Sequence, residues 1–408
     1  MVTMENEKQP FNNLTSVVQS LPAESYFKSE IYESELNAVW YRNWIYAGRS
    51  DEIENTGDYK AIKIGSQNIL ILRDTDNSIK GFFNTCRHRG SILCTAEHGH
   101  LGTHKISCPY HRWTYALDGR LVRTPNLTPT DDFNASSYSL YPVAIEQWGG
   151  SIFVNLAGEN ASGFRTVFSE TLFPEAVSSE TTNAGHDRLA AWPLEELKVV
   201  HSYENRLHCN WKIFWENFVE CYHCPGIHPG LCDLVPIYKR SFLCSDDEPD
   251  WERHGHKDDP KYRGGLKPGA ASWTMDGKIH GVPFPGISKE DREMGYVYLQ
   301  NLPSMFIVAH LDYVRIVSVL PDGPEHIQLK AQWLLSEASL AKKDLDLSKI
   351  VDFGLLVLKE DTLVCEINQQ GVQSIAHKNG VLMPQEYDVA NFHRWLRVQT
   401  GERKIQER

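Results

Sequence analysis

The spacing of apolar residues changes along the chain, and this change predicts two kinds of structure. Residues 30–44 carry apolar side chains at helical spacing and are expected to form a helix. Between about residues 45 and 155, apolar and polar residues alternate in short runs separated by turn residues, which is typical of an antiparallel β domain. The predicted strands are 59–64, 68–72, 79–84, 113–117, 120–124 and 148–155.

The rest of the chain combines helical and alternating patterns. Helices are predicted over 210–223, 343–370 and 385–398, and strands over 295–302, 305–310, 313–320 and 326–336. Helices packed on one face of an antiparallel sheet make an α+β fold. A small, polar stretch at 158–163 marks the expected domain boundary. The prediction is therefore an N-terminal segment over 1–44 that packs on the larger domain, a small β domain over 45–160, and a larger domain over 165–408.

Composition narrows the class of protein. The chain has 408 residues and a net charge of -12, which argues against a nucleic-acid-binding protein because no basic stripe offsets it. Apolar runs are far shorter than the ~20 residues a membrane helix needs, and the N-terminus does not resemble a secretory signal. A cytoplasmic location is expected. In a reducing compartment, the nine cysteines favour metal binding over disulfides.

A first set of metal-binding residues lies in the small β domain. Cys86 and His88 form one Cys-x-His pair, and Cys108 and His111 form a Cys-x₂-His pair further on. Two thiolates on one iron and two imidazoles on the other are the ligands of a Rieske 2Fe-2S cluster. Tetrahedral zinc is the alternative, although the spacing differs from that of a zinc finger. With zinc, the protein would be a structural or redox-sensing protein rather than an enzyme.

A second set lies in the larger domain. His223 and His228 flank Pro225-Gly226, which should end the preceding helix and let both imidazoles reach one point. With one carboxylate they would form the facial triad of a non-haem Fe(II) oxygenase. Glu220 is one candidate for that carboxylate. Asp361 is preferred, because it falls at the end of an apolar helical stripe and should point inward.

The alternative for each histidine is an ordinary core residue that has its hydrogen bonds satisfied within the protein. Cys221 and Cys224 flank His223 as Cys-x₂-Cys, so a redox or zinc pair is a further alternative at this place.

With these residues together, the sequence resembles the oxygenase (α) subunits of Rieske non-haem iron oxygenases. The motifs that carry the resemblance are Cys-Arg-His-Arg-Gly90, Cys-Pro-Tyr-His-Arg-Trp-Thr-Tyr115, Asn-Trp-Lys212, Glu-Asn217, the pair His223 and His228, and Glu-Asp361. The resemblance implies a Rieske domain at 45–160 and a helix-grip catalytic domain with a curved antiparallel sheet at 165–408. It also implies mononuclear Fe(II), O₂ as co-substrate, an α₃ ring, and a separate flavin and iron-sulfur reductase that supplies electrons from NAD(P)H.

One departure from the family pattern concerns Glu220. The family usually has Asp three residues before the first iron histidine, where it links that histidine to a Rieske histidine of another subunit. By resemblance, Glu220 would accept hydrogen bonds from His223 and from His111 of the partner subunit, and Asn217 belongs to the same catalytic group. Glu at this place resembles the branch that acts on quaternary ammonium compounds such as carnitine, glycine betaine and choline.

The expected reaction is therefore hydroxylation of an N-methyl group or nearby carbon, followed by demethylation or C–N cleavage. The alternative is a ring-hydroxylating dioxygenase or monooxygenase that acts on an aromatic compound or aromatic acid. Four aromatic residues are candidates for holding a methylammonium head by cation–π contact, with a purely structural core role as the alternative. They are Trp215, Phe218, Phe306 and Tyr313.

Overall fold

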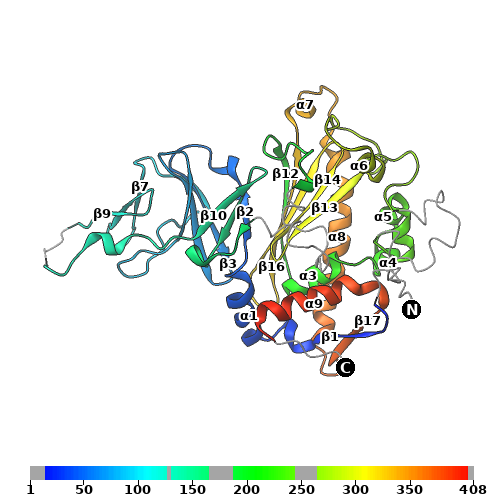
Figure 1. Ribbon diagram of the computed structural model, residues 1–408, viewed down its shortest axis with the longest axis horizontal. Coiled ribbons are helices and arrows are strands. Elements are labelled where there is room, and N and C mark those ends of the chain that lie inside the picture. Colours follow the sequence, from blue (N-terminus) through cyan, green and yellow to red (C-terminus); the bar gives the residue numbers. More distant parts are fainter. Residues whose placement is uncertain (1–13, 126–129, 165–186, 244–263, 403–408) are drawn as a thin grey trace, which may run out of the picture. The chain divides into compact units, whose positions relative to one another are not determined.

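The computed structural model describes residues 14–125, 130–164, 187–243 and 264–402 (Figure 1). The chain forms two compact units. The smaller contains Leu36–Val167 and Leu302–Ser304, and the larger contains Met1–Glu35, Phe168–Asn301 and Met305–Arg408. The first 13 residues of the expected N-terminal segment and the expected domain start at residue 165 lie outside the described residues.

The smaller unit is built from short antiparallel strands. One sheet has the order β5-β4-β3-β6, a second β10-β11-β2 and a third β7-β8-β9. The strands are β2 (Ile45–Arg49), β3 (Asp58–Ile64), β4 (Gln67–Arg73), β5 (Ile79–Phe83), β6 (His98–His100), β7 (Lys105–Ser107), β8 (Thr114–Ala116), β9 (Leu121–Arg123), β10 (Ala144–Trp148) and β11 (Ser151–Asn155). The predicted antiparallel β domain is confirmed.

The core of this unit explains where its cysteines lie. Leu70 and Leu72 of β4 point into an apolar cluster that also contains Tyr115, and Cys86 and Cys108 belong to the same cluster. Both cysteines therefore belong to the packed core of this unit.

The larger unit contains a five-stranded antiparallel sheet in the order β12-β16-β15-β14-β13. Its strands are β12 (Lys198–Leu207), β13 (Tyr296–Asn301), β14 (Met305–His310), β15 (Val314–Pro321) and β16 (Ile327–Leu335). The four predicted strands are confirmed, and β12 is an additional edge strand. A separate two-stranded sheet pairs β1 (Val18–Pro22) with β17 (Asn379–Leu382).

The helices within the described residues vary widely in length. They are α1 (Ser29–Glu35), α3 (Trp211–Phe218), α4 (Cys224–Ile227), α5 (Pro229–Leu234), α6 (Lys289–Met294), α7 (Glu337–Leu340), α8 (Leu347–Val372) and α9 (Tyr387–Thr400). A π-helical turn follows α1 at Leu36–Trp40, and short 3₁₀ segments occur at Ala23–Tyr26, Ser50–Ile53, Ala135–Tyr138, Gly158–Asn160, Pro236–Arg240 and Pro384–Glu386. No described helix is long and apolar enough to cross a bilayer.

Helix α3 is fixed in the larger unit by packing and by a buried ion pair. It contacts α8, α9 and β15, and Figure 1 shows α3 next to α9. Lys212 is fully buried, and its Nζ lies 2.8 and 2.7 Å from the two carboxylate oxygens of Glu35. The indole of Trp211 donates to the same carboxylate at 2.9 Å. These contacts hold in place the helix that leads into the metal-ligand segment.

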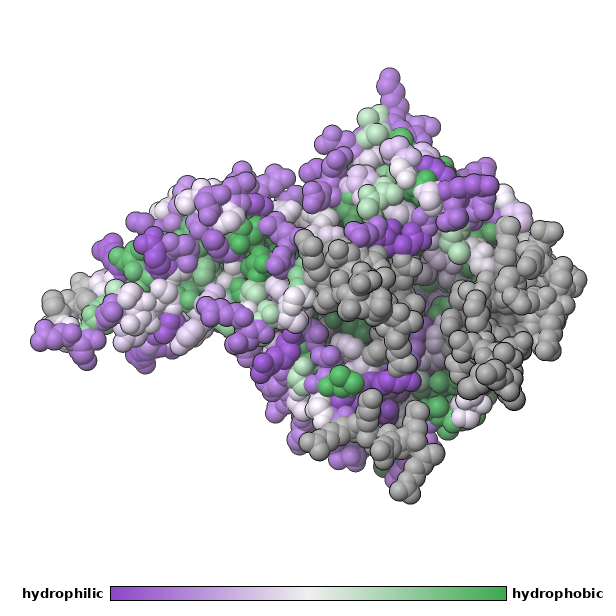
Figure 2. All heavy atoms as spheres, viewed as in Figure 1, coloured by the Kyte–Doolittle hydropathy of each residue, from purple (hydrophilic) through white to green (hydrophobic). Residues whose placement is uncertain are grey.

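Figure 2 shows one face of the molecule, with the residues that are not described in grey. The coloured part of this face has no large continuous apolar area. Apolar residues appear there as separate patches between polar ones. Such scattered exposure is ordinary for a folded protein.

Candidate metal centre and cavity

The segment that carries the two histidines follows α3, but its geometry differs from the prediction. The predicted helix over 210–223 ends at Phe218. Beyond it, the Glu220 carboxylate accepts hydrogen bonds from the backbone N–H groups of Tyr222 and His223, which fixes a turn in place of another helical turn. Tyr222, which a helix over 210–223 would turn inward with Phe218, is instead 45% exposed.

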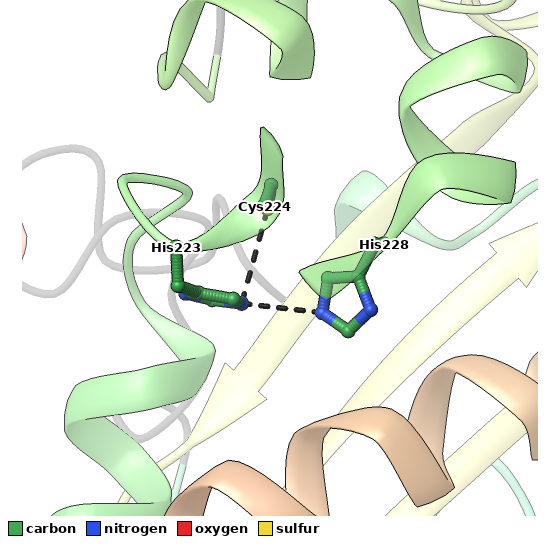
Figure 3. Close-up of side chains that lie close together, drawn as sticks. All are labelled: His223, Cys224 and His228. Carbon is green, nitrogen blue, oxygen red and sulfur yellow. Dashed lines mark hydrogen bonds between the residues drawn. The ribbon is translucent and has the colours of Figure 1, made fainter. Parts of the chain in front are cut away.

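Two carboxylates fix the orientation of the imidazoles. Glu220 Oε1 lies 2.5 Å from His223 Nδ1, and Glu360 Oε2 lies 2.8 Å from His228 Nδ1. Each carboxylate accepts a hydrogen bond from the Nδ1–H group of its imidazole, which directs the two Nε2 atoms toward one another. The two Nε2 atoms face each other at 3.2 Å (Figure 3).

Asp361 on α8 completes the group. Its Oδ1 lies 2.9 Å from His228 Nε2 and 3.5 Å from His223 Nε2, and it accepts a hydrogen bond from Asn217 Nδ2 at 2.8 Å. Two imidazole nitrogens and one carboxylate oxygen therefore converge on one point. Two imidazoles and one carboxylate fit the facial triad that holds Fe(II).

The pKa values of His223 and Asp361 show that this group of side chains favours a positive charge beside the carboxylate. Burial lowers the pKa of His223, but hydrogen bonds to Asp361 and Glu220 outweigh it and raise the pKa to about 10. Burial alone would raise the pKa of Asp361, whereas hydrogen bonds from both histidines hold it well below its usual range. In this arrangement the carboxylate is ionised and available as a ligand.

The cysteines beside His223 form a disulfide, Cys221–Cys224. The expectation that the cysteines favour metal binding over disulfides is therefore wrong for this pair. Cys224 Sγ lies 3.9 Å from His223 Nε2 (Figure 3). A sulfur in a disulfide is not a thiolate, so Asp361 is the better third ligand for a metal.

The residues of the first set gather at the tips of two loops in the smaller unit. Cys86 and His88 follow β5, and Cys108 and His111 lie between β7 and β8. The imidazoles pair with each other, their ring centroids 4.7 Å apart. Burial, opposed by a hydrogen bond from Tyr115, raises the pKa of the Cys86 thiol, and the adjoining Cys108 thiol adds to the rise.

This pairing of like ligands fits a Rieske cluster, in which the cysteines bind one iron and the histidines the other. His111 Nδ1 is buried and has no hydrogen-bond partner, so its lone pair is available to a metal. The cysteines are buried, whereas His88 is exposed. A cluster held here would have its histidine side toward solvent.

Beside the facial triad lies a cavity of about 140 Å³. Of the four aromatic candidates, Phe218 and Phe306 line it and stack with centroids 3.7 Å apart. Trp215 packs edge-on against both and is fully buried, and Tyr313 is buried with its hydroxyl donating to the Trp273 carbonyl. Neither of these two lines the cavity.

Several cavity residues were not predicted from the sequence. Tyr238, Trp273, Tyr298 and Arg315 line the cavity together with Phe218 and Phe306. Glu360, which orients His228, was also missed. Its position immediately before Asp361 was the available indication.

Comparisons with known proteins agree with this two-part arrangement. A family model described as "Rieske [2Fe-2S] domain" matches residues 43–138, and one described as "Ring hydroxylating alpha subunit (catalytic domain)" matches residues 194–402. The second match covers the five-stranded sheet, helices α3 to α9 and the ligand residues of the larger unit.

Two relatives match different shares of the chain. The "Glycine betaine monooxygenase oxygenase subunit" of Chromohalobacter salexigens is 29% identical over 92% of this chain and 84% of its own length. The "Carnitine monooxygenase oxygenase subunit" of Acinetobacter pittii is 30% identical over 59% of this chain and 60% of its own.

Solved structures share the fold. A quaternary ammonium Rieske monooxygenase in complex with L-carnitine has a TM-score of 0.67 at 20% identity, covering 97% of this chain and 99% of its own. A naphthalene 1,2-dioxygenase from Rhodococcus sp. bound to indole has a TM-score of 0.66 at 19% identity, covering 94% and 95%. Fold similarity therefore does not separate these two substrate classes.

Proposed function

The chain belongs to the ring hydroxylating alpha subunit family, and from this premise we propose that it is the oxygenase component that hydroxylates an N-methyl group of a quaternary ammonium compound. The observation that carries the proposal is an aromatic-walled cavity beside two imidazoles and a carboxylate whose nitrogen and oxygen atoms converge. The names of the glycine betaine and carnitine relatives support the same substrate class.

Seven residues would hold the metals. His223, His228 and Asp361 would bind mononuclear Fe(II), and the 2Fe-2S cluster would be bound by Cys86, His88, Cys108 and His111. When bound, these groups supply oxygen activation and electron transfer. Glu220, Glu360 and Asn217 hold the iron ligands in the required orientation.

A second hollow, of about 550 Å³, reaches His223 and is the proposed place where electrons reach the mononuclear iron site. Glu216, Glu220 and Glu386 line it, and His223 lies in its wall. We infer that the Rieske loops of a second copy dock here, with Glu220 accepting a hydrogen bond from His111 of the partner subunit.

The charge of the Rieske loops suits this docking. Arg89 and Arg112 are exposed and lie next in sequence to His88 and His111. Their positive charge complements the carboxylates of the hollow. A closed ring of copies is the simplest assembly in which every copy both gives and receives such a contact.

The aromatic walls suit a methylated ammonium head. Such a cation has no N–H to donate, so it is recognised mainly by ring faces. Insertion of one oxygen atom of O₂ into an N-methyl C–H bond, with two reductase electrons and two protons reducing the other atom to water, would give an N-hydroxymethyl ammonium. Loss of its hydroxyl proton then releases formaldehyde and the tertiary amine. The aromatic residues that line the cavity are Phe218, Tyr238, Trp273, Tyr298 and Phe306.

The second candidate is a dioxygenase of aromatic compounds, favoured by the fold shared with naphthalene dioxygenase. The cavity argues against an aromatic hydrocarbon, because the buried guanidinium of Arg315 lines it. A hydrocarbon would leave that charge without a partner.

The test is a substrate panel with the metal-loaded enzyme and a reductase. Oxygen uptake and formaldehyde release are measured for quaternary ammonium compounds, tertiary amines and aromatic acids. One formaldehyde per O₂ consumed with a quaternary ammonium compound is the expected result. Hydroxylated aromatic products without formaldehyde would favour the second candidate.

A further inference from the structure

We propose that Arg315 binds a carboxylate of the substrate, so that the substrate is a zwitterion with a methylated ammonium at one end and a carboxylate at the other. This inference rests on the proposed function and narrows it. It separates betaine-type substrates from cations such as choline, which carries the same trimethylammonium head but a hydroxyl in place of the carboxylate.

Arg315 lies on β15 and points toward α8. Its side chain lines the cavity and is only 6% exposed. Nη1 donates to the Gly354 carbonyl at 3.1 Å. A Cβ on Gly354 would lie 2.7 Å from Nη1 and 3.3 Å from the Trp333 ring. The guanidinium can therefore approach the helix this closely only because residue 354 has no side chain.

The guanidinium lacks a counter-ion within the part of the chain that the structure describes. Its Nε is buried with no hydrogen-bond partner. Asp312, three residues earlier, is already engaged by the Ser272 hydroxyl and by the backbone N–H groups of His280 and Gly281. Asp361 is engaged by the imidazoles. A buried, unpaired charge is strongly unfavourable, and an anion that enters the cavity would relieve this cost.

A second donor lies beside it. Trp273 Nε1 is also buried without a partner, and the indole ring centroid is 5.9 Å from Arg315 Cζ. Two neighbouring donors without acceptors match the acceptor-only chemistry of a carboxylate. A hydroxyl or a methylammonium group would leave the charge of Arg315 uncompensated.

The spacing along α8 suits a small zwitterion. Arg315 contacts Gly354, and Asp361 is seven residues further along the same helix, which corresponds to about 10 Å at the α-helical rise. The Trp273 and Tyr298 rings line the cavity with these residues, and Tyr298 stands edge-on to Phe218 at 5.8 Å. A molecule that places its carboxylate at Arg315 therefore brings its ammonium to the aromatic walls nearer the triad.

The experiment measures binding without turnover. Glycine betaine, choline and benzoate are titrated calorimetrically into the full-length, metal-loaded protein under anaerobic conditions. Glycine betaine is expected to bind at least about 10-fold more tightly than choline, the value of one hydrogen bond to a charged group. Equal affinity for the two would overturn the role of Arg315 while leaving the proposed function intact. Binding of benzoate but of neither quaternary ammonium compound would overturn the proposed function itself.

Variants locate the effect. Arg315→Gln should weaken glycine betaine binding about 10- to 100-fold and change choline binding little, whereas Arg315→Lys should retain part of the affinity. Arg206→Gln is the matched control, because Arg206 is exposed on β12 of the same sheet and pairs with Asp322. If Arg315→Gln fails to fold, Gly354→Ala displaces the guanidinium instead. An equal loss for both ligands in the folded variants would contradict the proposal.

Discussion

The hydrogen bond between His228 and Glu360 allows a quantitative prediction for a residue that is not itself a ligand. Glu360 Oε2 accepts from His228 Nδ1 at 2.8 Å. A hydrogen bond to a charged group is worth about 1.5–3 kcal/mol, and the loss of such a partner typically weakens metal binding about 10- to 100-fold. The Glu360 side chain is 25% exposed, so solvent screens it and the lower end applies. Glu360→Leu should therefore weaken Fe(II) binding by about 1.5 kcal/mol, or about 10-fold.

The assay is anaerobic competition for Fe(II) with a coloured chelator, with the Rieske spectrum recorded in the same samples. Glu360→Gln, which keeps an acceptor but loses the charge, should lie between wild type and Glu360→Leu. Glu366→Gln is the control, since Glu366 lies on the same helix but accepts from the backbone N–H of His208. Unchanged iron affinity in Glu360→Leu, or an equal loss in the control, would refute the reasoning.

Three further predictions concern activity and stability. Asp361→Ala should remove the mononuclear iron while the visible and EPR spectra of the Rieske cluster persist, and loss of both signals would mean that this carboxylate is structural. Glu220→Gln should retain both metals but abolish turnover, so an active variant would exclude Glu220 from the electron route. Glu35→Gln leaves the Lys212 ammonium buried without its counter-ion and should lower the free energy of unfolding by about 3–5 kcal/mol, measured by urea denaturation. A loss below 1 kcal/mol would show that water reaches this pair.

The sequence was sufficient for features that depend on local spacing. His223 and His228 fall on one short segment, and Asp361 ends an apolar helical stripe, so their convergence could be anticipated. The end of α3 could not, because it depends on the Glu220 side chain capturing backbone N–H groups in place of another helical turn. Helical periodicity carries no information about that competition.

The cavity walls were harder to predict because they come together only in the tertiary structure. Trp273 lies in a loop without periodic neighbours, and Tyr298 and Arg315 are on different strands of the sheet. One indication was available: Arg315 is a charged residue within an otherwise apolar run, and a buried charge needs a partner. β12 also carried a visible alternation, with Ser202, Glu204 and Arg206 exposed on one face.

Helix α8 fixes the distance between the Arg315 contact at Gly354 and the Asp361 carboxylate. The helix carries the contact to the guanidinium and, two turns later, the carboxylate of the triad. Helical geometry therefore sets the distance between the Arg315 end and the triad end of the cavity. The aromatic walls come instead from α3, the 3₁₀ segment at Pro236–Arg240, a loop, and strands β13 and β14. Selectivity for the length of the substrate and selectivity for its ammonium group thus depend on different parts of the chain. Substitutions can change one of them while the other is retained.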